Sequence, residues 1–353
     1  MKVLITGGCG FLGSNLAASY LSEQAEVIIA DALFRKGSEQ NLEWLRSQAP
    51  GSQLLFHQID LADDAALDEI FRRYVPFDYI CHLGGQVAMT TSLADPRRDL
   101  LTNVVGSFNI LESTRRHSPD SVIAYSSTNK VYGDLKDLPY QEESSRYSLP
   151  GYPDGFDESV PLDFASPYGC SKGSADQYIR DWHRNFGLKT VVFRHSSIYG
   201  GRQFATIDQG WIGWFCHKAL EQQSAFAAGA EPKPFTIHGS GKQVRDVLHA
   251  DDLIRLYRAA YSNGGRAAGQ VFNIGGGISN SLSLLELFGL LEKTLGLERP
   301  LHFTQLERRR SDQDFFVADI RKARDYLGWA PLVTREQGIS MMLDWCRGTM
   351  RRA

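Results

Sequence analysis

The residues best suited to chemistry in this chain are Tyr168 and Lys172, which stand four positions apart. On a helix, this spacing places both side chains on one face. A free phenol has a pKa of about 10, and a nearby ammonium favours the phenolate and brings that pKa toward the operating range. The pair is therefore suited to taking a proton from a substrate hydroxyl.

A third side chain can assist that pair. Residues 122–126 predict a buried strand, and Thr128 stands just beyond its end. A hydroxyl at this position can share the substrate proton with Tyr168. Because Tyr-x-x-x-Lys pairs also occur by chance on many helices, this interpretation depends on the segments that accompany the pair.

A glycine triplet near the N-terminus predicts phosphate binding. Residues 3–6 predict a buried strand, glycines follow at intervals of three, and residues 11–23 predict a helix. Glycines let the backbone approach a phosphate closely, and the unpaired N–H groups at a helix N-terminus hold the negative charge. We therefore expect a dinucleotide to contact Gly7, Gly10, Phe11, Leu12 and Gly13.

An acidic residue indicates which dinucleotide binds. A second apolar run, residues 27–30, leads into Asp31, 18 residues beyond Gly13. This is close to where a carboxylate binds the adenosine ribose. A carboxylate accepts a hydrogen bond from a 2′-hydroxyl and repels a 2′-phosphate, so the sequence favours NAD over NADP. Arg35 and Lys36 follow in a loop, and we expect Arg35 to contact the adenosine side.

Strand and helix patterns alternate through the first half of the chain. This alternation predicts an α/β fold, namely a Rossmann-type doubly wound parallel sheet, with ligands beyond the strand C-termini. Strands are expected over residues 3–6, 27–31, 54–58, 79–83, 122–126 and 190–194, and helices over 11–23, 41–46, 64–74, 102–117 and 166–186.

The later part of the chain predicts a smaller α/β substrate-binding lobe. Residues 138–167 are rich in Pro, Gly, Ser and acidic side chains, which predicts a long loop. We expect the NAD-binding domain to span 1–195, with about 244–270 returning to it. The substrate-binding lobe would then comprise about 196–243 and 271–353.

Composition excludes several function classes. The 353 residues include 38 basic and 41 acidic side chains, so a net charge of −3 gives no reason to expect nucleic-acid or membrane partners. The first strand begins at once, so we expect no signal peptide. The five cysteines are scattered and form no C-x-x-C pair, so we expect no disulfide framework, no metal site and a cytoplasmic location.

Together, these motifs resemble the extended short-chain dehydrogenases/reductases, in particular their nucleotide-sugar branch. The resemblance covers nearly the whole chain. It rests on the glycine triplet, Tyr168, Lys172 and residues 60–61, 82–86, 103–106, 126–133, 245–249 and 309–312.

This resemblance implies specific roles. Thr128, Tyr168 and Lys172 would be catalytic, Tyr168 and Lys172 would also contact the cofactor, and a homodimer or homotetramer would pack helices 102–117 and 166–186 into a four-helix bundle. Arginine forks suit phosphate oxygens. The cofactor would be lined further by Asp60, Leu61, Leu83, Gln86, Asn103 and His195, and the substrate pyrophosphate would be bound by Arg245 and Arg309.

Four positions depart from the branch pattern, one of them Ser311, where a glycine is usual. The 4,6-dehydratases carry Asp-Glu after the catalytic threonine, where this chain has Asn129 and Lys130. Neither side chain can act as a carboxylate acid or base, which disfavours water elimination. Ser197 stands where an asparagine is common, so the substrate contact expected there rests on a hydroxyl instead.

Longer strings narrow the resemblance to the CDP-sugar 2-epimerases of this branch. They are residues 126–134, 193–197, 201–206, 208–211, 213–215 and 241–246. This resemblance implies inversion at C2 of a CDP-3,6-dideoxyhexose, from CDP-paratose to CDP-tyvelose. Because C2 carries no acidic hydrogen, inversion calls for transient oxidation to a 2-ketosugar and hydride return from a tightly bound, recycled NAD. Thr90 and Thr91 are placed to meet the sugar.

Three alternatives stay open from the residues alone. The same machinery serves a 4-epimerase of a UDP- or dTDP-hexose. A net NAD-dependent nucleotide-sugar dehydrogenase would release NADH instead of recycling it. A dinucleotide-sensing regulatory protein would have no need of the phenol–ammonium pair.

Overall fold

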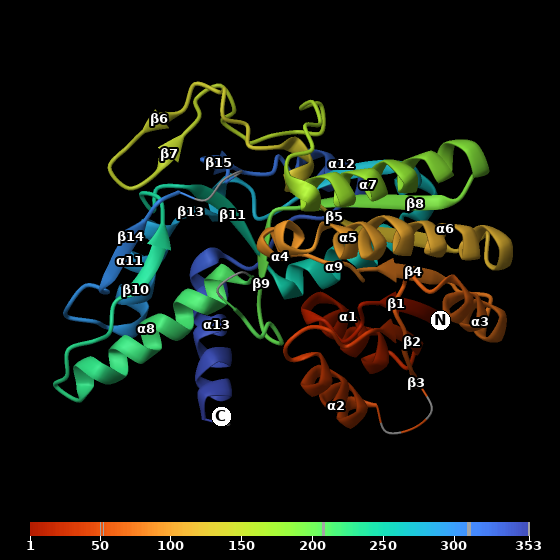
Figure 1. Cartoon of the computed structure of the whole chain (residues 1–353), viewed down its shortest axis with the longest axis horizontal. Coiled ribbons are helices and arrows are strands. Elements are labelled where there is room, and N and C mark those ends of the chain that lie inside the picture. Colours follow the sequence, from red (N-terminus) through yellow and green to blue (C-terminus); the bar gives the residue numbers. More distant parts are fainter. Residues whose placement is uncertain (50, 52, 207–208, 309–311, 352–353) are drawn as a thin grey trace.

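The computed structural model describes residues 1–49, 51, 53–206, 209–308 and 312–351 (Figure 1). A large parallel sheet with helices on both faces lies beside a smaller lobe, and the chain passes between the two more than once. Among the described residues, none of the helices combines the length and the apolar character needed to cross a bilayer.

The main sheet of the described chain has seven parallel strands in the order β12-β8-β5-β4-β1-β2-β3. Near-continuous apolar runs form them, as expected for parallel strands that are covered on both faces. The strands are β1 (Lys2–Thr6), β2 (Glu26–Asp31), β3 (Leu54–Gln58), β4 (Tyr79–His82), β5 (Val122–Thr128), β8 (Lys189–His195) and β12 (Gln270–Ile274).

Helices enclose an apolar core on each face of the sheet (Figure 1). Val3 and Ile5 point into one core while Leu4 points into the other, as the two-residue period of a strand dictates. The first core is covered by α1 (Phe11–Ser22), α2 (Ser38–Gln48), α9 (Ala250–Ser262) and α12 (Arg321–Leu327); the second by α3 (Asp64–Tyr74), α6 (Gly106–His117) and α7 (Ser166–Phe186). The predicted doubly wound sheet is confirmed.

The helix expected over 102–117 begins earlier and is interrupted. Asp95 caps a short helix by accepting from the Arg98 N–H, and Pro96 occupies its first turn. A π-helical turn then leads into α6. The segments are α4 (Met89–Ala94), α5 (Pro96–Leu100) and the turn Leu101–Val105.

Strand β12 was not predicted. It pairs with β8 in the main sheet, although residues 271–353 were expected in the lobe. Helix α12 also packs on this sheet, since Ala323 and Leu327 lie in its core. The main domain therefore continues past residue 270, whereas residues 244–249, which were expected to return to it, pair with strands of the lobe. The exact domain boundary stays a prediction.

The smaller lobe is built around a second set of apolar side chains, including Phe215, Leu287 and Met342. Its helices are α8 (Trp211–Ala227), α11 (Leu284–Leu295) and α13 (Arg335–Met350), and its strands are β9 (Ser197–Tyr199), β10 (Phe235–His238), β11 (Val244–His249), β13 (Ser281–Ser283), β14 (Phe303–Leu306) and β15 (Phe315–Phe316). Three short helical segments complete the described structure, and they are not all in the lobe: Asn129–Tyr132, α10 (Gly264–Ala267) and Ile278–Asn280.

The segment expected as a long loop, 138–167, holds a small hairpin of β6 (Gln141–Glu142) and β7 (Tyr147–Ser148). It packs against the lobe through Phe156, whose ring lies 5.5 Å from that of Phe316. Figure 1 shows the hairpin projecting beside β13 and α11.

Candidate active site

A cleft of about 700 Å³ opens at the C-terminal ends of the parallel strands, between the main sheet and the lobe. This is the edge at which open α/β sheets bind ligands. Its lining includes most of the side chains that the sequence singled out, namely Gly7, Gly10, Phe11, Leu12, Gly13, Asp31, Arg35, Asp60, Leu61, Leu83, Gln86, Thr128, Tyr168, His195, Ser197 and Arg245.

The glycine triplet forms a tight turn at one end of the cleft. Gly7 has a φ of 67°, and a Cβ there would lie 2.8 Å from the Gly84 backbone. A Cβ at Gly13 would lie 2.2 Å from the Gly7 carbonyl oxygen. Helix α1 begins after Gly10, which has no side chain to cap it. Backbone N–H groups at this helix start therefore face the cleft, where a phosphate fits.

Asp31 is held in place at the end of β2. Its Oδ2 accepts from the Cys9 N–H at 2.9 Å, and its Oδ1 accepts from the Leu33 N–H at 2.8 Å. Burial raises the pKa of this carboxyl, and those hydrogen bonds lower it in part. The carboxylate is thus oriented into the cleft, where it can accept from ribose hydroxyls.

Thr128 and Tyr168 meet at the centre of the cleft. Strand β5 extends to Thr128, two residues beyond the predicted end, and α7 brings in Tyr168, which is 9% exposed. Burial raises the pKa of Tyr168 to about 12, while the hydrogen bond with Thr128 lowers it in part. Arg35 also lowers this pKa, but Lys172 is not among the groups that do so.

Lys172 lies behind the cleft instead of within its described lining. Its Nζ donates to the Ser126 carbonyl at 2.6 Å and lies 4.3 Å from the centre of the Tyr125 ring. Burial lowers the pKa of Lys172 to about 7, although Asp176 and Asp99 oppose that shift. The expected lowering of the phenol pKa by Lys172 is therefore not what this geometry produces.

Gln86 and Asn103 belong to a hydrogen-bond network next to the cleft. The Gln86 amide donates to Asp99 Oδ1 at 2.8 Å and to the Ala88 carbonyl at 2.7 Å. Asn103 Nδ2 donates to Ser171 Oγ at 2.9 Å, and its Oδ1 accepts from the Gln86 N–H at 2.9 Å. These side chains fasten the segment after β4 to α7, so their direct contact with a cofactor stays a prediction.

Asp99 is a buried residue that sequence reasoning missed. Its second oxygen accepts from Ser171 Oγ, one position before Lys172 on α7. The predicted helix began at residue 102, three residues after Asp99, so no periodicity in the sequence marked this carboxylate.

His195 ends β8 with both ring nitrogens lacking a hydrogen-bond partner among the described residues. Burial lowers its pKa to about 3, so the imidazole is neutral. A buried neutral imidazole with unmet hydrogen-bonding capacity lines the cleft, which suits contact with a polar ligand.

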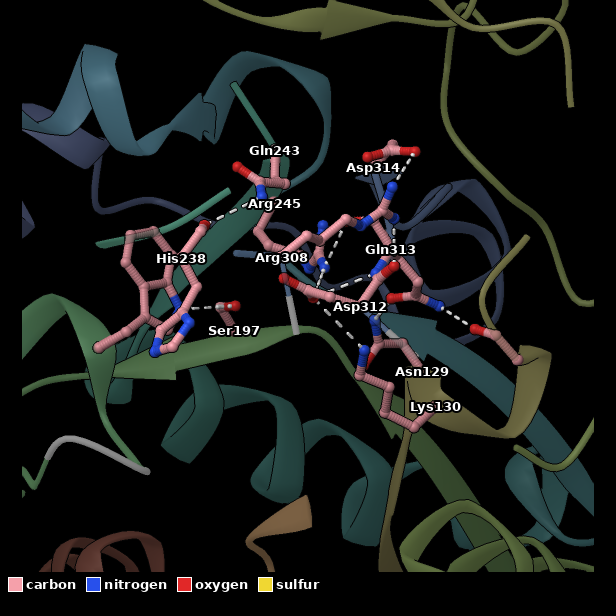
Figure 2. A network of polar contacts seen from close by, with 12 residues as sticks. Asn129, Lys130, Ser197, His238, Gln243, Arg245, Arg308, Asp312, Gln313 and Asp314 are labelled. Carbon is pink, nitrogen blue, oxygen red and sulfur yellow. Dashed lines mark hydrogen bonds and ion pairs between the residues drawn. The ribbon is translucent and has the colours of Figure 1, made fainter. Parts of the chain in front are cut away.

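The lobe contributes a charged network to the opposite wall of the cleft, seen in Figure 2. Arg245 Nη2 donates to Asp312 Oδ1 at 2.8 Å, and Lys130 Nζ lies 3.8 Å from the same oxygen. Ser197 Oγ accepts from the Trp211 indole N–H at 3.1 Å. Sequence reasoning did not assign Lys130 or Asp312 to a site.

One predicted substrate contact, Thr90, is absent from the described lining of the cleft. Thr90 has a buried hydroxyl with no hydrogen-bond partner among the described residues, and Thr91, not Thr90, belongs to the described cleft lining. Arg309 lies outside the described residues. Within the described ranges, no cluster of three or more His, Cys, Asp or Glu side chains is arranged to hold a metal ion.

Residues 4–342 match the family model described as GDP-mannose 4,6 dehydratase. The chain is 53% identical to CDP-paratose 2-epimerase of Salmonella typhi over 345 residues, which cover 98% of this chain and 99% of that protein. It is 30% identical to dTDP-glucose 4,6-dehydratase of Neisseria meningitidis serogroup B, over 98% of this chain and 92% of that protein.

Two solved structures share the fold over 99% of this chain and 100% of their own. The UDP-glucose 4-epimerase of Thermotoga maritima, solved with UDP-glucose, superposes with a TM-score of 0.81 at 28% identity. The UDP-glucuronic acid 4-epimerase of Bacillus cereus, solved with UDP-glucuronic acid and NAD, gives a TM-score of 0.80 at 26% identity.

Proposed function

Because the chain belongs to the GDP-mannose 4,6-dehydratase family, and so to the nucleotide-sugar branch of the extended short-chain dehydrogenases/reductases, we propose that it is an NAD-dependent 2-epimerase. Its substrate is a CDP-3,6-dideoxyhexose, and it interconverts CDP-paratose and CDP-tyvelose. The observation that carries this proposal is the 53% identity to a CDP-paratose 2-epimerase along almost the whole of both chains.

The residues present fit a dinucleotide. Gly7 and Gly13 keep open a turn that a Cβ would fill, Asp31 is oriented by two backbone N–H groups, and His195 has unmet hydrogen-bonding capacity among the described residues. When bound, NAD would supply the acceptor and then the donor of the hydride at C2 of the sugar, and its oxidised ring would add positive charge that favours the Tyr168 phenolate.

The protein's own residues handle the proton. Tyr168 Oη takes the proton of the 2-hydroxyl and holds it until the carbon is reduced again. Thr128, which is hydrogen-bonded to Tyr168, orients the substrate hydroxyl. Lys172 is fixed by the Ser126 carbonyl. Its remaining N–H donors would serve the cofactor ribose.

The lobe holds the nucleotide end of the substrate while the sugar turns its other face to the reacting group. Arg245 is the described residue best suited to bind the diphosphate, because it lines the cleft with a guanidinium fork. Asn129 donates to Gln313 Oε1 at 2.9 Å and carries no carboxylate. This arrangement favours epimerisation over water elimination.

We also propose that the protein forms a homodimer or a tetramer of such dimers through α6 and α7. An apolar face crosses both helices, with Phe108 39%, Tyr178 41% and Phe186 50% exposed. The Phe108 ring contacts Tyr178 and Trp182 edge-to-face at 6.0 and 5.5 Å between ring centres. The cytoplasmic location expected from the scattered cysteines stays a prediction.

The substrate assignment is tested with a panel of CDP-, UDP- and dTDP-hexoses, followed by NMR to show which carbon inverts. We expect inversion at C2 of CDP-paratose with no accumulation of NADH at 340 nm. Inversion at C4 of a UDP- or dTDP-hexose, or stoichiometric release of NADH, would replace this proposal with one of the alternative activities.

A further inference from the structure

Lys130 begins from the backbone next to the catalytic hydroxyl. Its N–H donates to Thr128 Oγ1 at 3.2 Å, and its side chain, 21% exposed, lines the cleft together with Tyr168. The Lys130 ammonium therefore lies on the wall of the cleft that also presents Thr128 and Tyr168, where it can act on the part of the substrate next to the reacting carbon.

This lysine shares one carboxylate with an arginine. Lys130 Nζ and Arg245 Nη2 lie 3.8 and 2.8 Å from the same oxygen of Asp312. Burial lowers the pKa of Lys130 to about 8, and the repulsion of Arg245 contributes to that shift. Asp312 and Asp134 oppose that shift. Lys130 and Arg245 are thus two cations held close together in the lining of the cleft, where a phosphate would interact favourably with both.

The loop that carries Lys130 is rigidly tied to the lobe. Asn129 Nδ2 donates to Gln313 Oε1 at 2.9 Å, and Gln313 Nε2 donates to the Gly133 carbonyl at 2.7 Å. Figure 2 shows Lys130, Asp312 and Arg245 converging beside this connection. The Lys130 and Arg245 cations are thus held at a fixed place relative to Thr128.

The choice of C2 as the reacting carbon places an anion, the sugar-linked phosphate, close to Thr128 and Tyr168. In a hexose joined to a diphosphate, C2 is bonded directly to the carbon that carries phosphate, whereas C4 lies across the ring from it. When the 2-hydroxyl faces Tyr168, the sugar-linked phosphate must therefore lie closer to Thr128 and Tyr168 than when the 4-hydroxyl does.

We propose that Lys130 binds the sugar-linked phosphate of the substrate and thereby presents C2, not C4, to Tyr168. Lys130 is on this account a specificity-determining residue that works beside Arg245. The inference rests on the proposed 2-epimerase function, since only that reaction places the phosphate so near the catalytic hydroxyls.

The test compares CDP, which ends in that phosphate, with CMP, which lacks it. Calorimetric titration of the NAD-loaded protein should show that Lys130→Met weakens CDP about 10- to 100-fold, as for loss of a charge-assisted hydrogen bond, and leaves CMP within about twofold. Lys130→Arg should restore most of the CDP affinity and of the kcat/KM for C2 inversion. Lys293→Met, an exposed lysine on α11, is the matched control and should match the wild type.

Three results would overturn the inference: unchanged CDP affinity in Lys130→Met, equal losses for CDP and CMP, or no recovery in Lys130→Arg. Each is separable from a failure of the proposed function. If the wild-type protein inverts C2 of no CDP-sugar, the function fails whatever the variants bind. If it does invert C2 while CDP and CMP respond alike to Lys130→Met, only the role of Lys130 fails.

Discussion

At the scale of single residues, the proposed reaction depends on the pKa of one buried phenol. Burial raises the pKa of Tyr168 to about 12, so Tyr168 is protonated at neutral pH in the free protein. Thr128 and Arg35 lower this pKa in part. The positive charge of oxidised NAD would lower the pKa of Tyr168 further. We therefore expect Tyr168 to act as a base only when the cofactor is bound.

The role of this phenol is tested by Tyr168→Phe. Loss of a general base typically costs about 10²- to 10⁴-fold in rate, so we expect kcat for C2 inversion to fall by that amount while CDP binding is unchanged. Tyr147→Phe, which alters a partly exposed tyrosine on β7 outside the cleft lining and outside α6 and α7, is the control. Turnover is measured by NMR of the sugar. Full turnover by Tyr168→Phe would show that another group moves the proton.

Much of the residue pattern was predictable because the motifs sit at strand ends that the sequence marks clearly. Gly7, Asp31 and Thr128, which stand at or just after such strand ends, all line the cleft. Lys130 and Asp312 were not assigned, because they meet only when a segment about 180 residues later folds against the Thr128 loop. No local pattern records such a contact.

At the scale of elements, the strand-to-helix turn after β1 is the most constrained part of the cleft. We expect Gly13→Ala to lower both the NAD content of the purified protein and its melting temperature, because the new Cβ would lie 2.2 Å from the Gly7 carbonyl oxygen. Gly289→Ala on α11 is the control, since its Cβ would meet nothing within 4 Å. That change should leave NAD content intact and stabilise by up to about 1 kcal/mol. A Gly13→Ala protein with normal NAD content and melting temperature would contradict the packing described here.

Strand β11 carries a buried carboxyl, that of Asp246, which joins the strand to two neighbouring segments. Its Oδ2 accepts from the Gly277 and Ala318 N–H groups at 3.0 and 3.2 Å, while its Oδ1 has no partner among the described residues. Burial raises the pKa of this carboxyl from 3.8 to about 6.

The sign of its effect on stability follows from linkage. The folded protein binds the Asp246 proton more tightly than the unfolded chain, so its stabilising contribution is complete below pH 3.8 and is lost as the pH rises toward about 6. In urea titrations, wild-type stability minus that of Asp246→Asn should therefore decline across this window. A difference that is flat or rises with pH would contradict the assignment.

The sequence predicted the elements of the first half well and those of the second half poorly. The main-sheet strands from β1 to β5 follow one another along the chain with helices between them, so a local pattern suffices for the strands. Strand β12 pairs with residues of β8 that lie 79 positions earlier, after the chain has built part of the lobe. Such non-local pairing is fixed by packing, which a periodicity does not record.

At the scale of the whole molecule, the sheet and the lobe are joined around the cleft. The Arg202 guanidinium lies 3.9 Å from the centre of the Trp44 ring on α2 and 4.9 Å from that of Trp345 on α13. Asn15 Nδ2 also donates to the Gly201 carbonyl at 3.0 Å. These contacts hold together the two walls between which the substrate must turn.

The proposed assembly is tested by Phe108→Glu. A carboxylate on the apolar face of α6 would be desolvated in a dimer, so light scattering should show a monomer while the wild type is dimeric or tetrameric. Phe34→Glu, which alters an exposed phenylalanine outside α6 and α7, should leave the assembly unchanged. A wild-type monomer, or an unaltered mass for Phe108→Glu, would exclude this face as the interface.

The central claim is that one hydride leaves C2 and returns to its other face without exchanging with solvent. CDP-paratose carrying deuterium at C2 is incubated with the protein in ordinary water, and the CDP-tyvelose formed is examined by NMR and mass spectrometry. We predict that the deuterium is retained at C2 of the inverted product. Replacement of that deuterium by solvent hydrogen would contradict the account.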